Sequence, residues 1–592
     1  MTSRIVPAVL ALAVLAACDA GRSTESKSTQ VTPVGPTAEK QEPTEEFVVH
    51  DEAASQPAQT PEESRSAFDS VRWNSAVGLG GGAGGHFAGR DPRKFEALRD
   101  LMRARNEDYE HIDEHGWHHA DADPLSTFAI DVDGASYGNL RRMLREGALP
   151  PPDAVRVEEC VNWFHYEDAA RPIDSEHDVA VQTEFAACPW QSDRRLLRVV
   201  LRARSIDPDD LPARNLVFLV DVSGSMEPEN KLPLIKRALL LLAREMRETD
   251  SIAIVTYAGE ARVALEPTTG RERDKIEAAI DALSAGGSTN GSSGIRLAYE
   301  LAHRRAGKST VDRVLLATDG DFNVGTTDRA DLISLIERER DSGVYLTVLG
   351  VGSGNLKDAT LEALGRHGNG LYAYLDSIAE ARRMLIDDCA STLVTMAKDT
   401  KVQIEFNPRF VGAWRQIGYE NRKLAARDFN DDLKDAGEMG AGHVVTALYE
   451  IVPSGGDLPR PEVDPLRYGT QTETGTPRDD EVARGELLTV KVRYQHRNGG
   501  ASRLVMAHVA PDPIAAPGTD FRFAGAVAAF AMCLRGSPQV AGYELADVLA
   551  AARDAKGADP TGERAEFLQI VQMAIDLRAT SASRSGAGQR ER

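Results

Sequence analysis

The stretch Asn215-Leu-Val-Phe-Leu-Val-Asp221-Val-Ser223-Gly-Ser225 joins an apolar run to a carboxylate and two hydroxyls at alternate positions. The run is short and continuously apolar, which is typical of a strand buried on both faces of a parallel sheet. A helical pattern begins near Lys231. Ligands of open α/β sheets bind beyond the carboxyl ends of the strands, so these oxygens are candidate ligands of a hard divalent cation.

Residues 215–396 alternate between apolar runs and helical patterns, which predicts a doubly wound, Rossmann-like α/β domain. The predicted strands are 216–222, 251–257, 263–265, 311–318, 344–351 and 370–374. The predicted helices are 231–248, 271–283, 291–305, 328–341, 357–365 and 377–397. We expect only strand 263–265 to be antiparallel, because a tight turn after Gly259 joins it to its neighbour.

Two further segments place oxygen ligands at the same sheet edge. Strand 311–318 leads into Asp319-Gly320, and the loop Gly286-Gly-Ser-Thr289-Asn opens a helix. Two carboxylates and three hydroxyls, with water, suit octahedral Mg²⁺ or Mn²⁺. The set contains no His or Cys, which argues against zinc.

The five positions Asp221, Ser223, Ser225, Thr289 and Asp319 resemble the metal-ion-dependent adhesion site (MIDAS) of von Willebrand factor type A (VWA) domains. The resemblance implies that the three hydroxyls bind the metal directly and that the two carboxylates act directly or through water. It also implies that an Asp or Glu of a protein partner completes the metal shell. The expected function is therefore metal-dependent protein binding, without enzymatic activity or a small-molecule substrate.

The flanks resemble bacterial YfbK-type VWA lipoproteins. The resemblance lies in Pro124-Leu-Ser-Thr-Phe with Asp131-Val-Asp133, in Pro150-Pro-Pro-Asp-Ala-Val-Arg-Val-Glu-Glu, and in Phe523-Ala-Gly-Ala-Val-Ala-Ala-Phe530. It covers residues 90–580 and implies architecture and location, not a ligand.

The predicted organisation places the VWA domain between β-rich and helical segments. It comprises a signal peptide 1–18, a disordered tether 19–90, an α+β region 91–205, the VWA domain 210–397, a β and helical region 398–580 and a disordered tail 581–592. Strands are expected at 177–186, 195–203, 401–406, 443–453 and 486–495. Our preferred topology joins these five strands in one sheet, with the VWA domain inserted.

The N-terminus predicts a lipid anchor. Arg4 precedes an apolar run, 5–17, that is too short to span a bilayer but fits a signal peptide, and the run ends in Leu15-Ala-Ala-Cys18. This resembles a lipobox, in which Cys18 is lipidated; the alternative is an ordinary signal peptide with a chance cysteine. The expected location is the bacterial envelope, facing the periplasm, and Asp19 slightly favours the inner membrane. The tether composition predicts disorder with a reach of about 45 Å.

The formal net charge of −22 argues against nucleic acid as a partner and is consistent with solubility alone. Four cysteines follow Cys18, and they are either disulfide-bonded or isolated buried thiols. They are Cys160, Cys188, Cys389 and Cys533. The histidine-rich segment 111–119 lacks a fixed metal-ligand spacing.

Three other functions are weaker interpretations. A nucleotide hydrolase would need a P-loop, but the near match 302–309 lacks its first glycine and precedes a strand. A serine hydrolase would need a Gly-x-Ser-x-Gly elbow and a histidine base at a neighbouring strand end. A VWA scaffold that acts without metal remains an alternative.

Overall fold

The computed structural model describes residues 107–130, 133–166, 173, 176–287, 292–307, 310–320, 329–354, 356–432, 434, 436–459, 485–497 and 499–587. The predicted signal peptide 1–18, the predicted tether 19–90 and Thr289 lie outside these residues.

Strand β5 (Ala213–Asp221) lies inside a sheet with the order β10-β9-β8-β5-β6-β7. It pairs in parallel with β8 (Thr310–Thr318) and β6 (Ser251–Tyr257). The parallel part continues through β9 (Val344–Val351) and β10 (Tyr372–Leu375). Only β7 (Ala261–Thr269) runs antiparallel, so the predicted doubly wound sheet and its antiparallel strand are confirmed.

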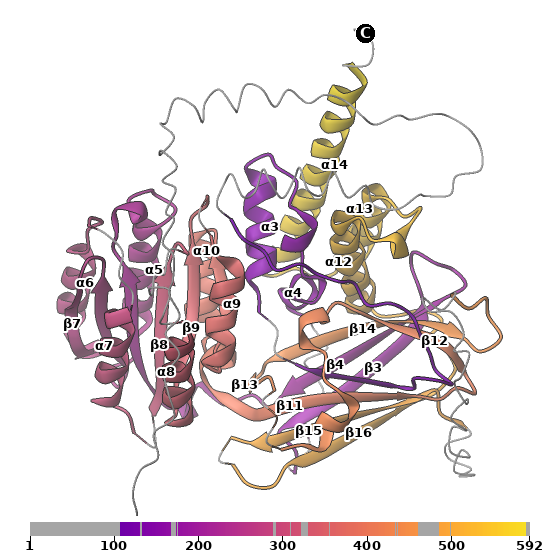
Figure 1. The fold of residues 1–592 in the computed structure, drawn as a ribbon, viewed down its shortest axis with the longest axis horizontal. Helices are drawn as coiled ribbons and strands as arrows, with labels where there is room; N and C mark the ends of the chain where they lie inside the picture. The colour runs from indigo at the N-terminus through magenta and orange to yellow at the C-terminus, as the bar shows by residue number, and fades with distance from the viewer. Residues whose placement is uncertain are drawn as a thin grey trace, which may run out of the picture. The chain divides into compact units, whose positions relative to one another are not determined.

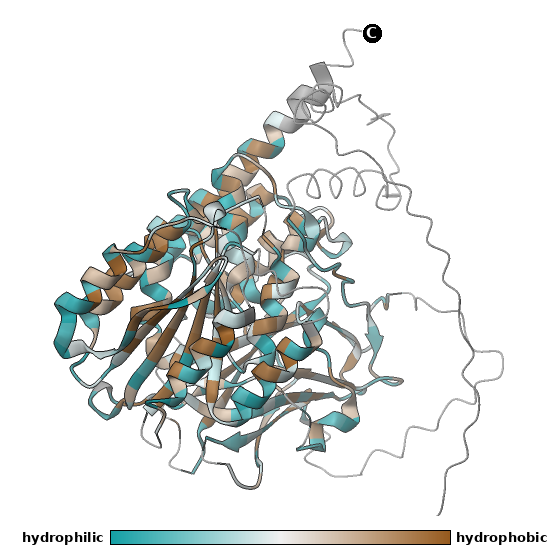
Figure 2. Ribbon diagram, turned by 60° about the vertical axis from the view of Figure 1, so that its left-hand side comes forward, coloured by the Kyte–Doolittle hydropathy of each residue, from teal (hydrophilic) through white to brown (hydrophobic). Residues whose placement is uncertain are grey.

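Helices cover both faces of this sheet. Alternate residues of each strand point to opposite faces, and because both sets are apolar, both faces must be shielded from water. Phe218 belongs to the core that includes α5 (Leu232–Glu245) and α6 (Arg273–Asp281). Leu219 belongs to the core on the other face, with α7 (Ser292–His303), α8 (Arg329–Asp341) and α9 (Asp358–His367). Figure 2 shows the apolar strands enclosed by helices whose outer faces are polar. Continuous Val and Leu runs are therefore required in these strands.

A β-sandwich lies beside the α/β domain (Figure 1). One sheet has the order β1-β12-β14-β4-β3 and the other has the order β13-β11-β15-β16, with β2 also paired to β11. The first comprises His118–His119, Val411–Ile417, Val444–Pro453, Arg195–Ala203 and Val179–Ala187. The second comprises Met439–Gly440, Thr395–Phe406, Leu488–His496, Arg503–Val509 and Leu125–Ala129. Inward side chains of both sheets share one core, as Val199, Val445 and Val490 show.

Five helices pack on the other face of the first sheet. They are α3 (Ala135–Arg145), α4 (Val157–Asn162), α12 (Thr519–Arg535), α13 (Leu545–Asp554) and α14 (Glu563–Ala587). Their common core includes Leu196 and Leu448 of the sheet and Phe523 and Phe530 of α12. Helix α12 is buried along almost its whole length, so it is the centre of this helical layer.

The predicted insertion of the α/β domain between strands of a β-rich part is confirmed in part. Strand β4 precedes the α/β domain and pairs with β14, which follows it, from Val444↔Arg202 onward. The prediction of a single sheet is wrong, because β11 and β15 belong to the second sheet. The α/β domain therefore interrupts a sandwich rather than one sheet.

The single long helix predicted at 377–397 is also wrong. The chain forms α10 (Ile378–Arg382), a π-helical turn (Arg383–Asp387) and α11 (Cys389–Leu393), and then enters β11. Thr395 pairs with Gly440 and Ala397 with His496, so strand pairing overrides the helical pattern here.

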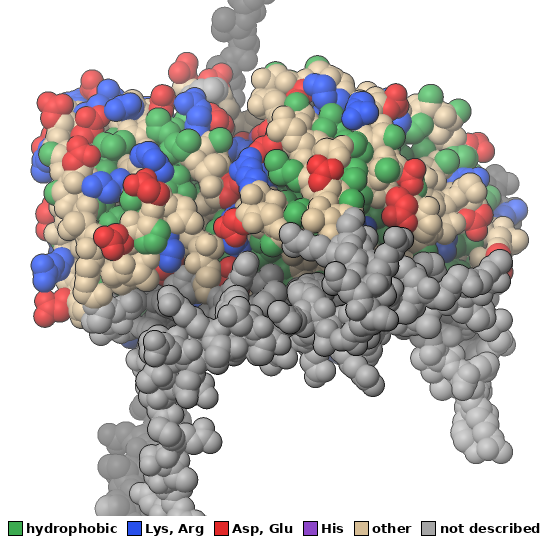
Figure 3. All heavy atoms as spheres, turned by 90° about the horizontal axis from the view of Figure 1, so that it is seen from above, with side chains coloured by type: hydrophobic (Ala, Val, Ile, Leu, Met, Phe, Trp, Pro, Cys, Tyr) green, Lys and Arg blue, Asp and Glu red, His purple; other side chains and the backbone are tan. Residues whose placement is uncertain are grey.

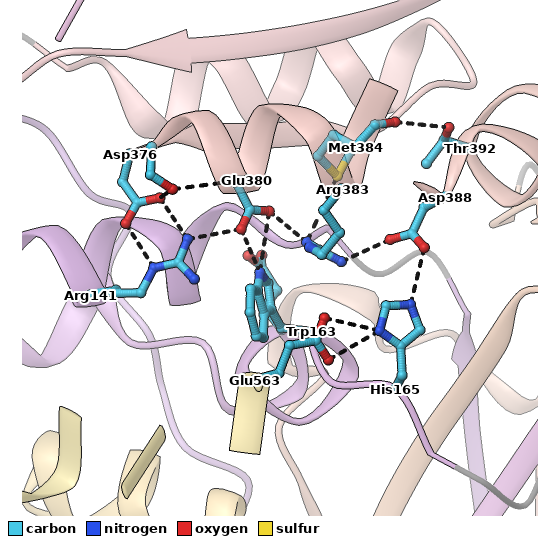
Figure 4. Close-up of polar contacts among 12 residues, drawn as sticks. Arg141, Trp163, His165, Asp376, Glu380, Arg383, Met384, Asp388, Thr392 and Glu563 are labelled. Atoms are coloured by element: carbon cyan, nitrogen blue, oxygen red, sulfur yellow. Dashed lines mark hydrogen bonds and ion pairs between the residues drawn. The ribbon is translucent and has the colours of Figure 1, made fainter. Parts of the chain in front are cut away.

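Ion pairs hold this broken helix against the helical layer, and those of Arg141 are buried (Figure 4). Arg141 of α3 donates to Asp376 and to Glu380 at 2.8 Å, and the Trp163 indole also donates to Glu380. At the other end, His165 lies 3.0 Å from Asp388 and 3.1 Å from Glu563 of α14. The hydrogen bonds that His165 donates to the Asp388 and Glu563 carboxylates raise its pKa to about 10, so it is protonated at neutral pH.

Other sequence predictions need correction. Helix α14 continues to Ala587, so the tail predicted to be disordered from residue 581 is helical up to that point. Strands β2, β12 and β16 were not predicted, because each is short or carries charged residues and depends on distant partners.

Cys160, Cys188, Cys389 and Cys533 are all free thiols, so the disulfide alternative is not realised. No helix among the described residues has the length and apolar character needed to cross a bilayer. On the face shown in Figure 3, acidic and basic side chains are interspersed, so the net negative charge is not gathered into one patch there.

We predict that Asp250→Asn destabilises the fold by about 2–3 kcal/mol at pH 7, since it removes the charged acceptor of a buried cluster. Asp250 is buried before β6 and accepts hydrogen bonds from Arg214 and Arg247. Burial raises its pKa, but the bonds from both arginines outweigh this and lower the pKa to about 2. Its contribution is therefore present above pH 3.8 and is lost as the pH falls toward 2.

Urea denaturation at pH 7, 5 and 3 measures this effect, with Glu260→Gln as the control because Glu260 is exposed. The difference between wild type and Asp250→Asn should narrow at pH 3. A difference that stays constant across this range would contradict the assigned role of the carboxylate.

Candidate metal centre

The end of β5 orients Asp221 by hydrogen bonds from three directions. Asp221 is the last residue of the strand and is fully buried. Its Oδ1 accepts from the Ser223 backbone at 2.8 Å, as in an Asx-turn. Its Oδ2 accepts from the Tyr257 hydroxyl at 3.2 Å and the Thr318 hydroxyl at 3.4 Å. The carboxylate is therefore fixed before any ion binds.

The two predicted serine ligands lie together. A short 3₁₀ turn (Gly224–Met226) follows Ser223 and brings Ser225 back toward it, so that the two Oγ atoms lie 3.1 Å apart. Adjacent ligands of an octahedral Mg²⁺ ion, each about 2.1 Å from the metal, are separated by about 3.0 Å. Ser223 is buried and Ser225 is exposed, so this pair has one open side.

Asp319 directly follows β8, the parallel neighbour of β5, and is fully buried. Val220 of β5 pairs with Ala317 of β8, so the two strands end side by side. Asp221 and Asp319 thus lie at one sheet edge, as the sequence predicted. The negative charge of Asp319 contributes to raising the pKa of Asp221, although burial of Asp221 is the larger cause.

The Gly-rich loop is anchored beside the serines. Gly286 N donates to Val222 O at 2.7 Å, and Gly224 N donates to Gly287 O at 3.2 Å. Gly287 has a φ of +91°, a conformation that favours glycine. Two residues later comes Thr289, which lies outside the described residues.

Sequence reasoning missed Lys231, whose ammonium lies 2.7 Å from Asp319 Oδ2. Lys231 is the N-cap residue of α5 and is buried. Its side chain packs so closely on Gly352 that a Cβ there would lie 2.3 Å from Lys231 Cε. Nothing in the spacing of the five motif residues indicates a lysine here, because it comes from the start of the next helix.

The donor set fits a hard cation that relies on hydroxyls and water. The described residues contain no group of three or more His, Cys, Asp or Glu that could hold a metal ion. The predicted set has only two carboxylates, both buried, and the pair of serine hydroxyls has the spacing of adjacent octahedral ligands. Asp221, Ser223, Ser225 and Asp319 would hold the ion, which would supply an electrophilic position for a partner oxygen.

The histidine-rich segment does not form a second centre. His111 pairs with Asp153 at 3.0 Å, and His118 pairs with Asp123 at 2.8 Å and stacks on Trp414. Asp133, of the Asp131-Val-Asp133 segment, accepts hydrogen bonds from Tyr372 N and from the Arg422 guanidinium. These residues therefore connect parts of the fold.

Comparison with known proteins identifies the family of the chain and of its α/β domain. The family model "von Willebrand factor type A domain" matches residues 215–384, "Uncharacterized protein YfbK, C-terminal" matches 391–577, and "von Willebrand factor" matches 103–198. "Uncharacterized protein YfbK" of Escherichia coli is 43% identical over 475 residues, which are 79% of this chain and 80% of that protein. The chain belongs to the YfbK family.

Similarities to other proteins cover smaller parts of the chain. Human inter-alpha-trypsin inhibitor heavy chain H3 is 29% identical over 268 residues, which are 41% of this chain and 29% of that protein. The solved structure "von Willebrand factor type A from Catenulispora acidiphila" is 16% identical, with a TM-score of 0.37, over 65% of this chain and 89% of that one. The VWA domain is a protein-interaction module, and proteins that carry it are mostly adhesion or scaffold proteins.

Proposed function

We propose that this chain is a lipid-anchored protein that binds a protein partner through Mg²⁺ at the MIDAS. The observation that carries the proposal is the convergence of Asp221, Ser223, Ser225 and Asp319 at one sheet edge, with the two serine oxygens 3.1 Å apart. The proposal includes Thr289 as the fifth ligand.

The donor chemistry explains why a partner should be acidic. Neutral hydroxyls next to the ion leave it electrophilic, so an added carboxylate is attracted to it. Ser225 is exposed, so the open side of the site faces solvent. An Asp or Glu on a partner protein is then the natural last ligand, and we infer that the protein is a binding protein and not an enzyme.

A second candidate, a VWA scaffold that acts without metal, is favoured by one observation. The Lys231 ammonium already supplies a positive charge to Asp319 at 2.7 Å. This internal cation could compensate the buried carboxylate permanently, and the site would then bind partners through hydrogen bonds alone. Measuring metal affinity separates the two functions.

We predict that the full chain binds Mg²⁺ with one site and that Asp221→Asn abolishes this binding, because the buried acceptor loses its charge. Isothermal titration calorimetry measures both. Glu227→Gln is the matched control, since Glu227 is an exposed carboxylate two residues beyond Ser225. Absence of binding, or equal binding by both variants, would favour the metal-free scaffold.

In the same titration, Lys231→Met should bind Mg²⁺ about tenfold more tightly. Removal of a cation about 5 Å from the divalent ion lowers their repulsion by at least about 1–2 kcal/mol, the value for a dielectric constant of about 80. The variant should also unfold at lower temperature in metal-free buffer and recover when Mg²⁺ is added, because Asp319 is buried. Unchanged or weaker affinity would show that Lys231 does not compete with the ion.

For the partner, we predict that cross-linking in envelope preparations captures a protein only when divalent metal is present. Chelation and Asp221→Asn should both abolish capture, whereas Glu227→Gln should not. Capture of the same protein under all conditions would overturn metal bridging while leaving a scaffold role.

We also propose that lipid on Cys18 anchors the chain to the envelope membrane, facing the periplasm. The support is Leu15-Ala-Ala-Cys18 after an apolar run. Radiolabelled palmitate should label the wild type and not Cys18→Ser. Label that persists in the variant would rule out this attachment.

A further inference from the structure

A cavity of about 370 Å³ lies between the α/β domain and the β-sandwich. Arg313 of β8 and Arg366 of α9 line it from the α/β domain, and Arg422, Lys423 and Glu438 line it from the sandwich part. Asp319 directly follows β8, whereas Arg313 lies near the middle of the strand, six residues earlier and about 20 Å away at 3.3 Å per residue. The cavity is therefore separate from the candidate metal centre.

The lining is basic in a chain whose net charge is −22. Arg422 is compensated by Asp133 and Glu362, each at 3.0 Å. Arg313, Arg366, Lys423 and Lys434 remain as sources of positive charge, opposed by Glu438. A concave surface with one sign of charge focuses its field and attracts ions of the opposite sign.

Arg313 is the clearest sign of a missing partner. Its guanidinium is buried, and it donates only to neutral oxygens, Thr347 Oγ1 at 2.9 Å and Leu393 O at 3.5 Å. Its Nε has no hydrogen-bond partner, and the guanidinium lies over the Tyr345 ring, 5.6 Å from the ring centre. Tyr345 and Glu438 offset the effect of burial only in part. Burial lowers the pKa of Arg313 to about 10, which reflects this poor compensation. Burying a cation is costly unless it is paired, so an anion beside Arg313 would be favoured.

Glu438, the carboxylate of the cavity, opposes an anion only weakly. Its Oε1 accepts from Asn369 at 2.8 Å, and its Oε2 is buried without a hydrogen-bond partner. Burial raises the pKa of Glu438 to about 7, so the group is only partly ionised at neutral pH. The protein thus lowers the negative charge on this wall of the cavity.

We propose that this cavity binds a small organic polyanion, with two or more carboxylate or phosphate groups, held by Arg313 at the buried end and Arg366 and Lys423 at the exposed end. Guanidinium groups pair with both kinds of anion through two parallel hydrogen bonds. The volume is within the range of small-molecule sites, about 300–1,000 Å³. Because the ligand would contact both the α/β domain and the β-sandwich, it would stabilise the interface between them.

Calorimetric titration of the full chain with citrate and, separately, inorganic phosphate tests the proposal in buffer freed of divalent metal by chelating resin. We expect saturable binding of at least one of them and an increase in unfolding temperature. Arg366→Gln should weaken binding about tenfold and Arg313→Met at least as much, whereas Glu438→Gln should tighten it about threefold. Arg296→Gln, an exposed arginine of α7, should bind like the wild type.

Two results would overturn the proposal. One is no saturable binding of either anion by the wild type, and the other is equal binding by Arg366→Gln, Glu438→Gln and Arg296→Gln. Arg366 is exposed, so its variant stays informative even where Arg313→Met fails to fold. Asp221→Asn should bind the anion normally, which keeps this test independent of the metal site.

Discussion

The parallel pairing of β5 between β6 and β8 is the constraint on which the candidate site depends. It buries the strand on both faces, so its side chains must be apolar until the strand ends. The first polar side chain after this run is Asp221, at the sheet edge. The same register brings the end of β8, and so Asp319, to the neighbouring position. The geometry of the site follows from strand pairing rather than from the loops alone.

The sequence predicted this region well because short, contiguous stretches of residues determine its strands. Strands β5, β6, β8 and β9 each contain an apolar run, and Asp221 and Asp319 come directly after the runs of β5 and β8. The four described motif residues therefore lie where the pattern indicated. Lys231 was missed because its contact with Asp319 depends on where the N-terminus of α5 lies in space. The spacing of the motif residues contains no information about that position.

The flanks were less predictable because their strands are defined by distant partners. In β16, Leu504 and Met506 are exposed and the strand exists through its pairing with β15. The broken helix before β11 is a similar case, since Thr395 pairs with Gly440. Asp133, Arg422 and Glu362 form buried ion pairs across three segments of the chain. Such pairs add geometric specificity that a hydrophobic pattern does not encode.

The interruption of the sandwich has a consequence for how the chain folds. Arg202 of β4 must find Val444 of β14, roughly 240 residues later, and closing so long a loop slows folding. The α/β domain between them is dominated by nearer contacts and can fold first, which shortens the effective loop. Until β14 is synthesised, β4 has only β3 as a partner and exposes an apolar edge. During synthesis, the nascent sandwich is therefore the part of the molecule most in need of protection from aggregation.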